Sequence, residues 1–439
     1  MSTAPLVDRP GGTSLFLLPS GRVDGPTFLA DAHALAAALP EARHVFNLCR
    51  DRYHFVVAFA AALIRGQASL LCGDATPAVL EAVAARYGCA AALADDPAVP
   101  SPVPVIAVRP ERRRAPAPNP ALPREQLAAI VFTSGSTGVP TPHRKLWGAL
   151  VDRSRAAGLR FALEERGPAS IVGTVPPGHM YGFETTVLLP LHAACASWCG
   201  QAFFPGDVQA ALDAVPSPRV VVTTPLQMRA LLQGMDRAAV RALISATAPL
   251  DPAMAAAAET RWGAPVLEIF GATECGSIAS RRTVEGEAWS PYPGVTLREE
   301  GEATLVHAEQ MDAVTLADEL AMLGDGRFRL LGRRADMVKM GGRRASLAGL
   351  NRILTGLDGV RDGIFVVPDD LDRRTTARLL AVVVAPDRTA PSILADLRDR
   401  LDPLFLPRRV VHVEALPRNA LGKLPRQALL ELLARVEAG

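Results

Sequence analysis

The sequence lacks both a long hydrophobic run and a charge excess of either sign. Its longest uninterrupted apolar stretch covers residues 55–64 and ends at Arg65, whereas a bilayer-spanning helix needs about twenty apolar residues. We therefore expect no transmembrane segment. Lysine plus arginine (47) and aspartate plus glutamate (45) nearly cancel, leaving a net charge of +2. This balance excludes nucleic-acid binding that relies on bulk positive charge, and we expect no nucleic-acid partner.

Cysteine is also scarce, with six residues scattered over a chain of 439. That number and scatter do not match the disulfide scaffold of a secreted domain, and the N-terminus shows no basic-then-apolar export signal. We therefore expect reduced thiols and a cytoplasmic location. A hydrophobic fraction of 49% and a charged fraction of 21% are typical of a globular protein.

Lysine is the rarest basic residue. Only Lys145, Lys339 and Lys423 occur among the 47 basic residues, and the other 44 are arginine. Chance is one explanation. The other is that lysine is retained where the chemistry needs a compact ammonium group. The surroundings of each lysine decide between the two.

Strand-like and helix-like segments alternate along the chain, which favours a parallel sheet with helices on its faces. The first such alternation comprises a strand at 45–48, a helix at 53–64, a strand at 69–72 and a helix at 77–87. A stretch with nine prolines at 97–123 predicts an extended crossover, with a short strand at 103–108. Further strands are expected at 128–133, 170–175, 219–223, 243–246 and 265–270, and a helix is expected from about Lys145.

The texture changes near Gly332, where a glycine- and arginine-rich stretch begins. The remainder has strand patterns at 364–367 and 380–384 and a helix pattern at 392–401, and its size suits a small α+β domain. We therefore predict an α/β protein with a large multi-sheet N-terminal domain, residues 1–334, and a small mobile C-terminal domain, residues 335–439.

Four segments carry candidate chemistry. The first reads IVFTSGSTGVP, in which a buried strand enters a loop rich in hydroxyls and glycines. Such a loop is suited to cradling phosphate, because glycine lets the backbone approach an anion and hydroxyls add donors. The alternative is a flexible turn. The loop comprises Thr133, Ser134, Gly135, Ser136, Thr137 and Gly138.

The second segment, EIFGATECG, places Glu274 beside a glycine turn at a strand end, where one carboxylate could hold Mg²⁺ together with phosphate oxygens. The alternative is an acid favoured by a helix dipole. The third segment contains Asp318 and, fourteen residues later, GRRAD. The fourth, LPRNALGKLPRQAL, holds Lys423 in a turn between two prolines, where a plain surface lysine is the alternative.

These four segments, in this order, resemble the motifs of the adenylate-forming enzymes, which include acyl-CoA synthetases, peptide-synthetase adenylation domains and firefly-type luciferases. The resemblance covers about residues 44–430. It implies that the chain uses ATP to convert a carboxylic acid into an acyl-adenylate and pyrophosphate. The acyl group would then pass to a thiol.

The resemblance also implies individual roles. Residues 133–138 would hold the β- and γ-phosphates, Thr273 the α-phosphate and Glu274 the Mg²⁺. Asp318 would bind the ribose, supported by Arg333. The adenine wall would comprise Ala246, Thr247, Ala248, Pro249, Phe270 and Gly271. Residues of the acid pocket would be His179 as its gate, with Met180, Tyr181, Phe183, Thr224, Ala272, Cys275 and Gly276.

Two of the lysines would act in different steps. Lys423 would bridge the carboxylate and the α-phosphate during adenylation, and such a preorganised donor is worth about 10²- to 10³-fold in rate. Lys339 would approach the site during transfer to the thiol, after the small domain swings. The chain departs from the family at Thr141, where a lysine is usual, and His143, Arg144 and Lys145 are candidates to compensate.

The brevity of the chain and its TSGSTGVPTPHRK loop resemble the aryl-acid ligases of aryl-polyene and xanthomonadin-type pigment pathways. Those enzymes load a hydroxybenzoate-like acid onto an acyl carrier protein, so an aromatic acid and a carrier protein are the expected partners. Coenzyme A as acceptor is one alternative. A catalytically inactive nucleotide-binding relative is another, suggested by the departures at Thr141, Ala335 and Gly349.

Overall fold

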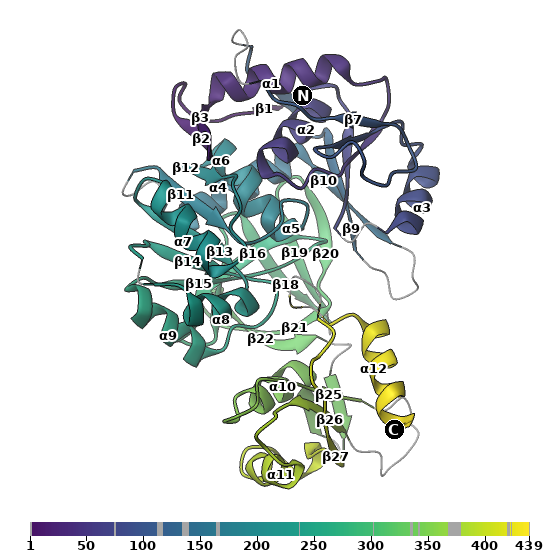
Figure 1. The fold of residues 1–439 in the computed structure, drawn as a ribbon, viewed down its shortest axis with the longest axis vertical. Helices are drawn as coiled ribbons and strands as arrows, with labels where there is room; N and C mark the ends of the chain where they lie inside the picture. Colours follow the sequence, from purple (N-terminus) through teal and green to yellow (C-terminus); the bar gives the residue numbers. More distant parts are fainter. Residues whose placement is uncertain are drawn as a thin grey trace.

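The chain forms a large body and a smaller one below it (Figure 1). The large body ends with β22 (Phe328–Arg333), and the small body begins with β23 (Met337–Met340). This computed structural model describes residues 2–73, 76–111, 117–133, 140–163, 167–236, 238–301, 303–333, 337–340, 343–367, 379–418, 422 and 424–438. The predicted boundary at 334/335 lies outside the described residues and stays a prediction.

The largest sheet of the big domain has eleven strands. In spatial order they are β21 (Asp318–Met322), β22, β17 (Ala288–Pro291), β16 (Gly276–Arg282), β15 (Val266–Ala272), β14 (Ala242–Ser245), β13 (Arg219–Thr223), β11 (Ala169–Gly173), β12 (Cys195–Trp198), β2 (Ser14–Leu18) and β3 (Gly21–Asp24). The run from β15 to β2 is parallel. Its central strands are short, apolar and buried on both faces, as parallel strands covered by helices are.

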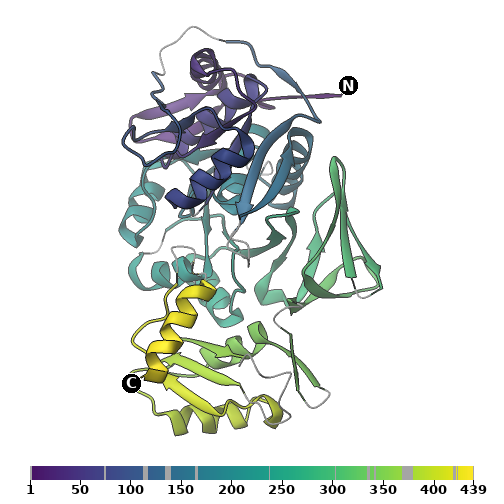
Figure 2. The same ribbon diagram turned by 90° about the vertical axis from the view of Figure 1, so that its right-hand side faces the viewer.

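A second, six-stranded sheet occupies the upper right of the large body in Figure 1. Its order is β10 (Thr141–Leu146), β9 (Leu127–Thr133), β5 (Ala68–Cys72), β4 (His44–Asn47), β6 (Ala92–Ala94) and β7 (Val105–Ala107). A three-stranded antiparallel sheet stands apart at the right of Figure 2 and comprises β18 (Val295–Glu300), β19 (Ala303–Ala308) and β20 (Met311–Thr315). The short strands β1 (Thr3–Pro5) and β8 (Ala121–Pro123) pair with each other.

The helices of the large domain cover these sheets. They are α1 (Gly25–Ala38), α2 (Arg52–Ile64), α3 (Pro77–Tyr87), α4 (Trp147–Arg160), α5 (Met180–Gly182), the π-helical turn η1 (Phe183–Leu188), α6 (Leu189–His192), α7 (Pro205–Ala214), α8 (Pro225–Gly234) and α9 (Pro252–Trp262). The apolar run noted in the sequence forms α2, which is buried along nearly its whole length. It contacts β4, β5 and β6 as well as η1, so it joins the two sheets. No described helix is long and apolar enough to cross a bilayer.

The small domain has a core of its own, built only from residues beyond β22. Its elements are β23, β24 (Arg343–Ser346), α10 (Leu347–Thr355), β25 (Asp362–Val366), β26 (Leu380–Val384), α11 (Ala390–Arg398), β27 (Arg409–His412) and α12 (Arg426–Ala438). This confirms the predicted fold class, an α/β protein with a large multi-sheet N-terminal domain and a smaller C-terminal one.

Most of the predicted elements are confirmed within a few residues, including the strands that became β11, β13, β14 and β15. The helix expected from about Lys145 is confirmed as α4, which begins at Trp147. Lys145 itself lies on β10, a strand that the sequence analysis does not predict. The physical reason is that residues 141–146 return from β9 as an antiparallel hairpin and pair with it along their length.

Candidate active site

Four loops of the large sheet meet at one edge. They follow the carboxyl ends of β11, β13, β14 and β15, which are parallel neighbours in register. Ligands of open α/β sheets bind outside this edge. The loops carry most of the described residues that the sequence assigned to the nucleotide and the acid, namely His179, Thr224, residues 246–249 and residues 271–274.

The loop after β14 is strained at one residue. Thr247 has a φ of 83°, in the left-handed region that a β-branched residue rarely adopts. Its hydroxyl oxygen is buried and lacks a hydrogen-bond partner in the described structure. Backbone strain and an orphaned polar atom both cluster at ligand sites. Ala248 and Pro249 are exposed beside it, while Ala246 is buried.

A buried glutamate fastens this loop to β15. The Glu268 carboxylate accepts the backbone N–H of Leu250 at 2.9 Å, and its other oxygen accepts Arg281 Nε at 2.8 Å. Thr283 Oγ1 donates to the same carboxylate at 3.1 Å. Because each oxygen has a partner, the charge is satisfied in spite of its burial. The end of the strained loop is thereby held to the neighbouring strand.

A buried lysine forms hydrogen bonds to the backbone of the turn after β15. Lys145 Nζ donates to the carbonyl oxygens of Thr273 at 2.5 Å and Glu274 at 3.0 Å. Burial lowers the pKa of the Lys145 ammonium, and the Glu184 carboxylate opposes that shift. Thr273 and Glu274 themselves remain half-exposed. Their backbone is therefore fixed while their side chains stay accessible.

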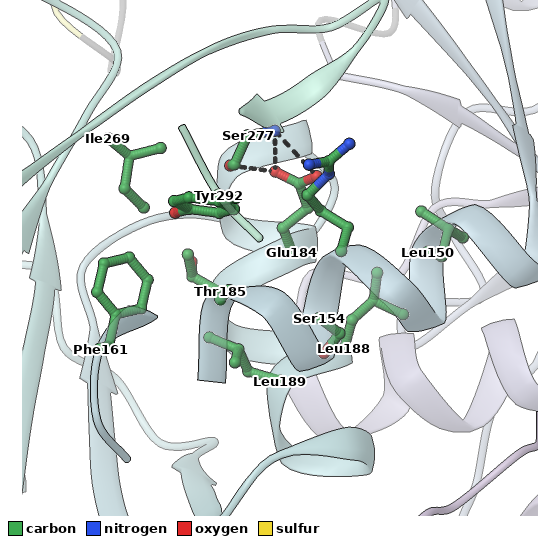
Figure 3. A pocket seen from close by; sticks show the side chains of 12 residues that line it. Leu150, Ser154, Phe161, Glu184, Thr185, Leu188, Leu189, Ile269, Ser277 and Tyr292 are labelled. Atoms are coloured by element: carbon green, nitrogen blue, oxygen red, sulfur yellow. Dashed lines mark hydrogen bonds between the residues drawn. The ribbon is translucent and has the colours of Figure 1, made fainter. Parts of the chain in front are cut away.

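The same turn is held at its other end by a buried acid. Ser277 donates to the Glu184 carboxylate through its hydroxyl at 2.5 Å and its backbone N–H at 3.1 Å (Figure 3). Burial raises the pKa of Glu184, and the Ser277 hydroxyl and Arg153 oppose the rise. Gly276, with a φ of 73°, leaves room for this carboxylate, because an added Cβ would lie 2.4 Å from Glu184 Oε1.

The predicted phosphate loop begins at the end of β9. The Thr133 hydroxyl lies 3.0 Å from His143 Nε2 on the paired strand β10. Burial lowers the pKa of His143. Ser134, Gly135, Ser136, Thr137 and Gly138 lie outside the described residues. Of the candidates to replace the missing lysine at Thr141, Lys145 is engaged with the turn after β15 instead.

The acid-pocket candidates fall into two groups. His179 is half-buried, and its ring lies against Gly73 at the end of β5, where an added Cβ would be 2.8 Å from two ring atoms. A Cβ added at Gly276 would lie 3.5 Å from Met180 Cε. These residues face the carboxyl edge. Thr224, Ala272 and Cys275 also lie there, and burial raises the pKa of the Cys275 thiol to about 11.

The second group lies deeper. The Tyr181 hydroxyl lies 3.0 Å from the Thr223 carbonyl oxygen and 2.9 Å from that of Ile244, so its ring spans the ends of β13 and β14. Burial raises its pKa. Phe183 is fully buried and packs edge-on against Phe59 at 5.0 Å between ring centres. The structure therefore places Phe183 in the core that joins the two sheets.

The two predicted ribose residues lie on the neighbouring strands β21 and β22, whereas the predicted adenine residue Phe270 lies on β15. Asp318 begins β21 and stands directly opposite Arg333 of β22 in register. Phe270 is 8% exposed, and its ring packs against Trp289 and Phe328 with centres 5.6 and 5.7 Å apart. Most of the Phe270 ring thus belongs to the core.

The small domain meets this edge at α8. Arg229 Nη1 donates to the Arg361 carbonyl oxygen at 2.8 Å. Leu226, in the first turn of α8, lies against Gly422, whose added Cβ would be 3.3 Å from that side chain. Lys423 lies outside the described residues, and Lys339 is on β23. Gly422, the neighbour of Lys423 in the sequence, therefore lies against a residue that is two positions after Thr224.

The sequence did not single out Glu184, Glu268, Gly73 or the buried role of Lys145. One signal was available for Glu184, because it is the only charged residue within the otherwise uncharged stretch 180–191. A lone charge in such a stretch is expected to be buried and paired. The other three depend on contacts between distant parts of the chain.

Comparison with known proteins identifies the family to which this chain belongs. The family model of the AMP-binding enzymes matches residues 28–315. A 4-coumarate–CoA ligase of Halorhodospira halophila is 28% identical over 306 residues, covering 66% of this chain and 73% of that protein. A 4-chlorobenzoate–CoA ligase of an Arthrobacter species is 28% identical over 360 residues, covering 71% of this chain and 67% of that protein.

Solved structures share the whole fold at lower identity. ATP-bound MatB from Rhodopseudomonas palustris superposes with a TM-score of 0.82 at 19% identity, covering 97% of each chain. The anthranilate CoA ligase AuaEII in complex with anthranoyl-AMP superposes with a TM-score of 0.81 at 17% identity, covering 98% of this chain and 95% of that one. Both comparisons extend over the large and the small domain.

Proposed function

Because this chain belongs to the AMP-binding enzyme family and is an AMP-forming ligase, we propose that it uses ATP to convert an aromatic carboxylic acid into an acyl-adenylate and then transfers the acyl group to a thiol. The observation that carries the proposal is the convergence at one sheet edge. The strained 246–249 loop, the fixed turn at Thr273 and Glu274, and the His179 segment all end there.

The described residues fit a nucleotide. The orphaned Thr247 hydroxyl and the open Ala248–Pro249 backbone suit the edge of a base. Asp318 suits ribose hydroxyls because a carboxylate accepts two hydrogen bonds. Thr273 is half-exposed and would contact the α-phosphate. The hydroxyl-rich 134–138 segment would hold the outer phosphates.

The donor set at Glu274 suits Mg²⁺. No cluster of three or more histidine, cysteine or acidic residues suited to a metal occurs among the described residues. Mg²⁺ in nucleotide sites is commonly held by one or two carboxylates together with phosphate oxygens. Glu274 would supply the carboxylate and ATP the remaining charge. The ion would neutralise charge on the leaving pyrophosphate.

Two thiols are candidate acceptors. Coenzyme A is supported by the relatives, whose names describe ligases of 4-coumarate and 4-chlorobenzoate with CoA. An acyl carrier protein is supported by the short chain and its TSGSTGVPTPHRK loop, which resemble the pigment-pathway ligases that load a hydroxybenzoate-like acid.

We also propose a cytoplasmic location, since all six cysteines are free thiols.

The test of the first step is acid-dependent release of pyrophosphate from ATP. Benzoate, hydroxybenzoates, cinnamates, malonate and a medium-chain fatty acid form a suitable panel. We expect at least one aromatic acid to give the highest kcat/KM. ATP binding without release by any acid would contradict the proposal and favour an inactive relative.

The test of the second step compares the two thiols directly. Coenzyme A and a phosphopantetheinylated carrier protein would be supplied with the best acid, and thioester formation would be measured by mass spectrometry. Efficient CoA thioester formation without carrier protein would overturn the carrier-protein assignment. Turnover with the carrier protein alone would overturn the CoA assignment.

A further inference from the structure

Two buried, oppositely charged side chains hold the two ends of one turn. The turn comprises residues 273–277, which run from the end of β15 into the first two residues of β16. Lys145 on β10 holds its first two carbonyl groups, and Glu184 on η1 holds the Ser277 backbone N–H and hydroxyl. Each charged residue comes from an element far away in the sequence.

The position of Lys145 suits a cation that can donate several hydrogen bonds. Lys145 is only 7% exposed, yet its ammonium reaches two successive carbonyl oxygens, those of Thr273 and Glu274. Since a trans peptide carries its C=O and N–H on opposite sides, the N–H groups of Glu274 and Cys275 face away from Lys145. The ammonium thus sets the orientation of two peptide planes.

The acid side fixes the remaining end. Glu184 is 8% exposed and sits beneath Gly276, where no side chain larger than hydrogen fits. It belongs to a π-helical turn, a form of helix that is rare and common at functional sites. A small cavity beside it is lined by Arg153, Ser154 and Tyr292, among others (Figure 3).

Such a pair is costly for stability alone. Two charges withdrawn from water lose hydration, and well-packed apolar residues of similar volume are often equally or more stabilising. The chain nevertheless places one of its three lysines here. The half-exposed side chains that the pair immobilises are those of Thr273 and Glu274.

We propose that Lys145 and Glu184 are positioning residues, which together orient the 273–277 turn so that Thr273 and Glu274 meet the α-phosphate and Mg²⁺ of the nucleotide. The inference rests on the proposed function, because it assigns the turn to MgATP. It also links β10, which follows the phosphate loop, to the metal-binding turn. β10 and the 273–277 turn are joined by the two hydrogen bonds of Lys145.

The decisive measurement compares the affinity for MgATP with that for adenosine, by calorimetry and without any acid. Lys145→Met retains the length of the side chain and removes its charge and donors. We expect it to weaken MgATP binding by about 10- to 100-fold, as loss of a group that orients a metal ligand does. Adenosine affinity should change by less than about twofold, because the predicted base and ribose residues lie on other loops.

A matched control separates positioning from general stability. Arg52 is another buried cation, and it donates to the carbonyl oxygens of Trp198 and Gly173 instead of to the turn. Arg52→Met should lower the thermal unfolding midpoint but leave the ratio of MgATP to adenosine affinity unchanged. Lys145→Gln, whose amide can still donate, is the milder variant and gives the same readout if Lys145→Met does not fold.

The pairing of the two charges is tested by combining variants. Glu184→Gln alone removes a negative charge that stabilises the buried Lys145 ammonium. The double variant Lys145→Met/Glu184→Gln should therefore lose less MgATP affinity than the product of the two single losses. Equal losses of MgATP and adenosine affinity in Lys145→Met would overturn the inference, as would wild-type MgATP affinity. These results leave the proposed function standing, because acid-dependent pyrophosphate release by the wild type is measured separately.

Discussion

The turn at 273–277 and the segment around Gly422 approach the same sheet edge but are held in opposite ways. The turn is fastened at both ends by buried charges within the large domain. The Gly422 segment belongs to a domain with its own core and meets α8 through Leu226, and the exposed Arg229 adds a hydrogen bond to Arg361 nearby. The side chains that hold the turn are buried, whereas Leu226 and Arg229 at the small domain are exposed.

From this difference we predict that the nucleotide-binding groups are fixed before the reaction and that those of the small domain arrive during it. Groups that bind the nucleotide gain from preorganisation, because no reorganisation is then needed when charge develops. A lysine that must act in one step and leave in the next gains from a contact that breaks at low cost. The surface between the domains accordingly contains an exposed arginine and an exposed leucine.

The largest expected effect comes from the small domain. Lys423→Ala should reduce adenylate formation by about 10²- to 10³-fold, through loss of electrostatic stabilisation. Transfer of the acyl group from a supplied acyl-adenylate should suffer far less. ATP–pyrophosphate exchange measures the first step, and thioester formation measures the second.

Lys339→Ala serves as the matched variant and should show the reverse pattern. Equal effects of both substitutions on both steps would contradict a small domain that changes position between the steps.

Two glycines with positive φ test the rigidity of each side. Gly276→Ala would place a Cβ 2.4 Å from Glu184 Oε1 at a φ of 73°, so it should cost about 2–4 kcal/mol in unfolding free energy. Gly422→Ala has a φ of 76° but meets the Leu226 side chain only at 3.3 Å, and should cost about 1–2 kcal/mol.

Urea denaturation of both variants measures the difference. Comparable losses would show that the 273–277 turn yields as readily as the segment at Gly422. In that case the buried charges do not hold the turn.

The sequence predicted the parts of the site that lie on one continuous segment. The strand at 265–270 and its glycine turn follow from an apolar run that ends in EIFGATECG, because that signal is local. The contact between Lys145 and Thr273 joins residues 128 positions apart, and no local pattern encodes it. For the same reason Lys145 was expected at a helix start, although pairing with β9 makes its segment a strand.

Aromatic residues show the same limit. A ring beside a glycine turn is compatible with a ligand wall and with a core, and only the packed neighbours decide. Phe270 packs with Trp289 and Phe328, which come from strands later in the chain. Phe183 packs with α2, which comes much earlier.

A smaller effect is expected at the acid side of the edge. Gly73→Ala would place a Cβ 2.8 Å from His179 Cε1 and Nδ1, which forces the ring to move. We expect the KM for the acid to rise by about tenfold, as changes of about one methylene in a pocket do. The KM for ATP should stay unchanged, because the three atoms nearest to the added Cβ all belong to His179.

Gly178→Ala is the control for that variant. It adds the same methyl group beside His179 but meets only Phe55 Cε2 at an ordinary 3.7 Å. Equal KM values for the two variants, or a change confined to ATP, would remove His179 from the acid pocket.

The smallest expected effect lies at the contact between the domains. Arg229→Ala removes the hydrogen bond to the Arg361 carbonyl oxygen, and an exposed bond of this kind contributes about 0.5–1.5 kcal/mol. Adenylate formation should fall by about two- to fivefold, because the small domain then spends less time with Gly422 against Leu226. Thioester formation from supplied acyl-adenylate should be unchanged or slightly faster. Arg298→Ala, which removes an exposed arginine on β18, should alter neither step. A decrease of both steps in Arg229→Ala would mean that α8 supports the large domain itself instead of a detachable contact.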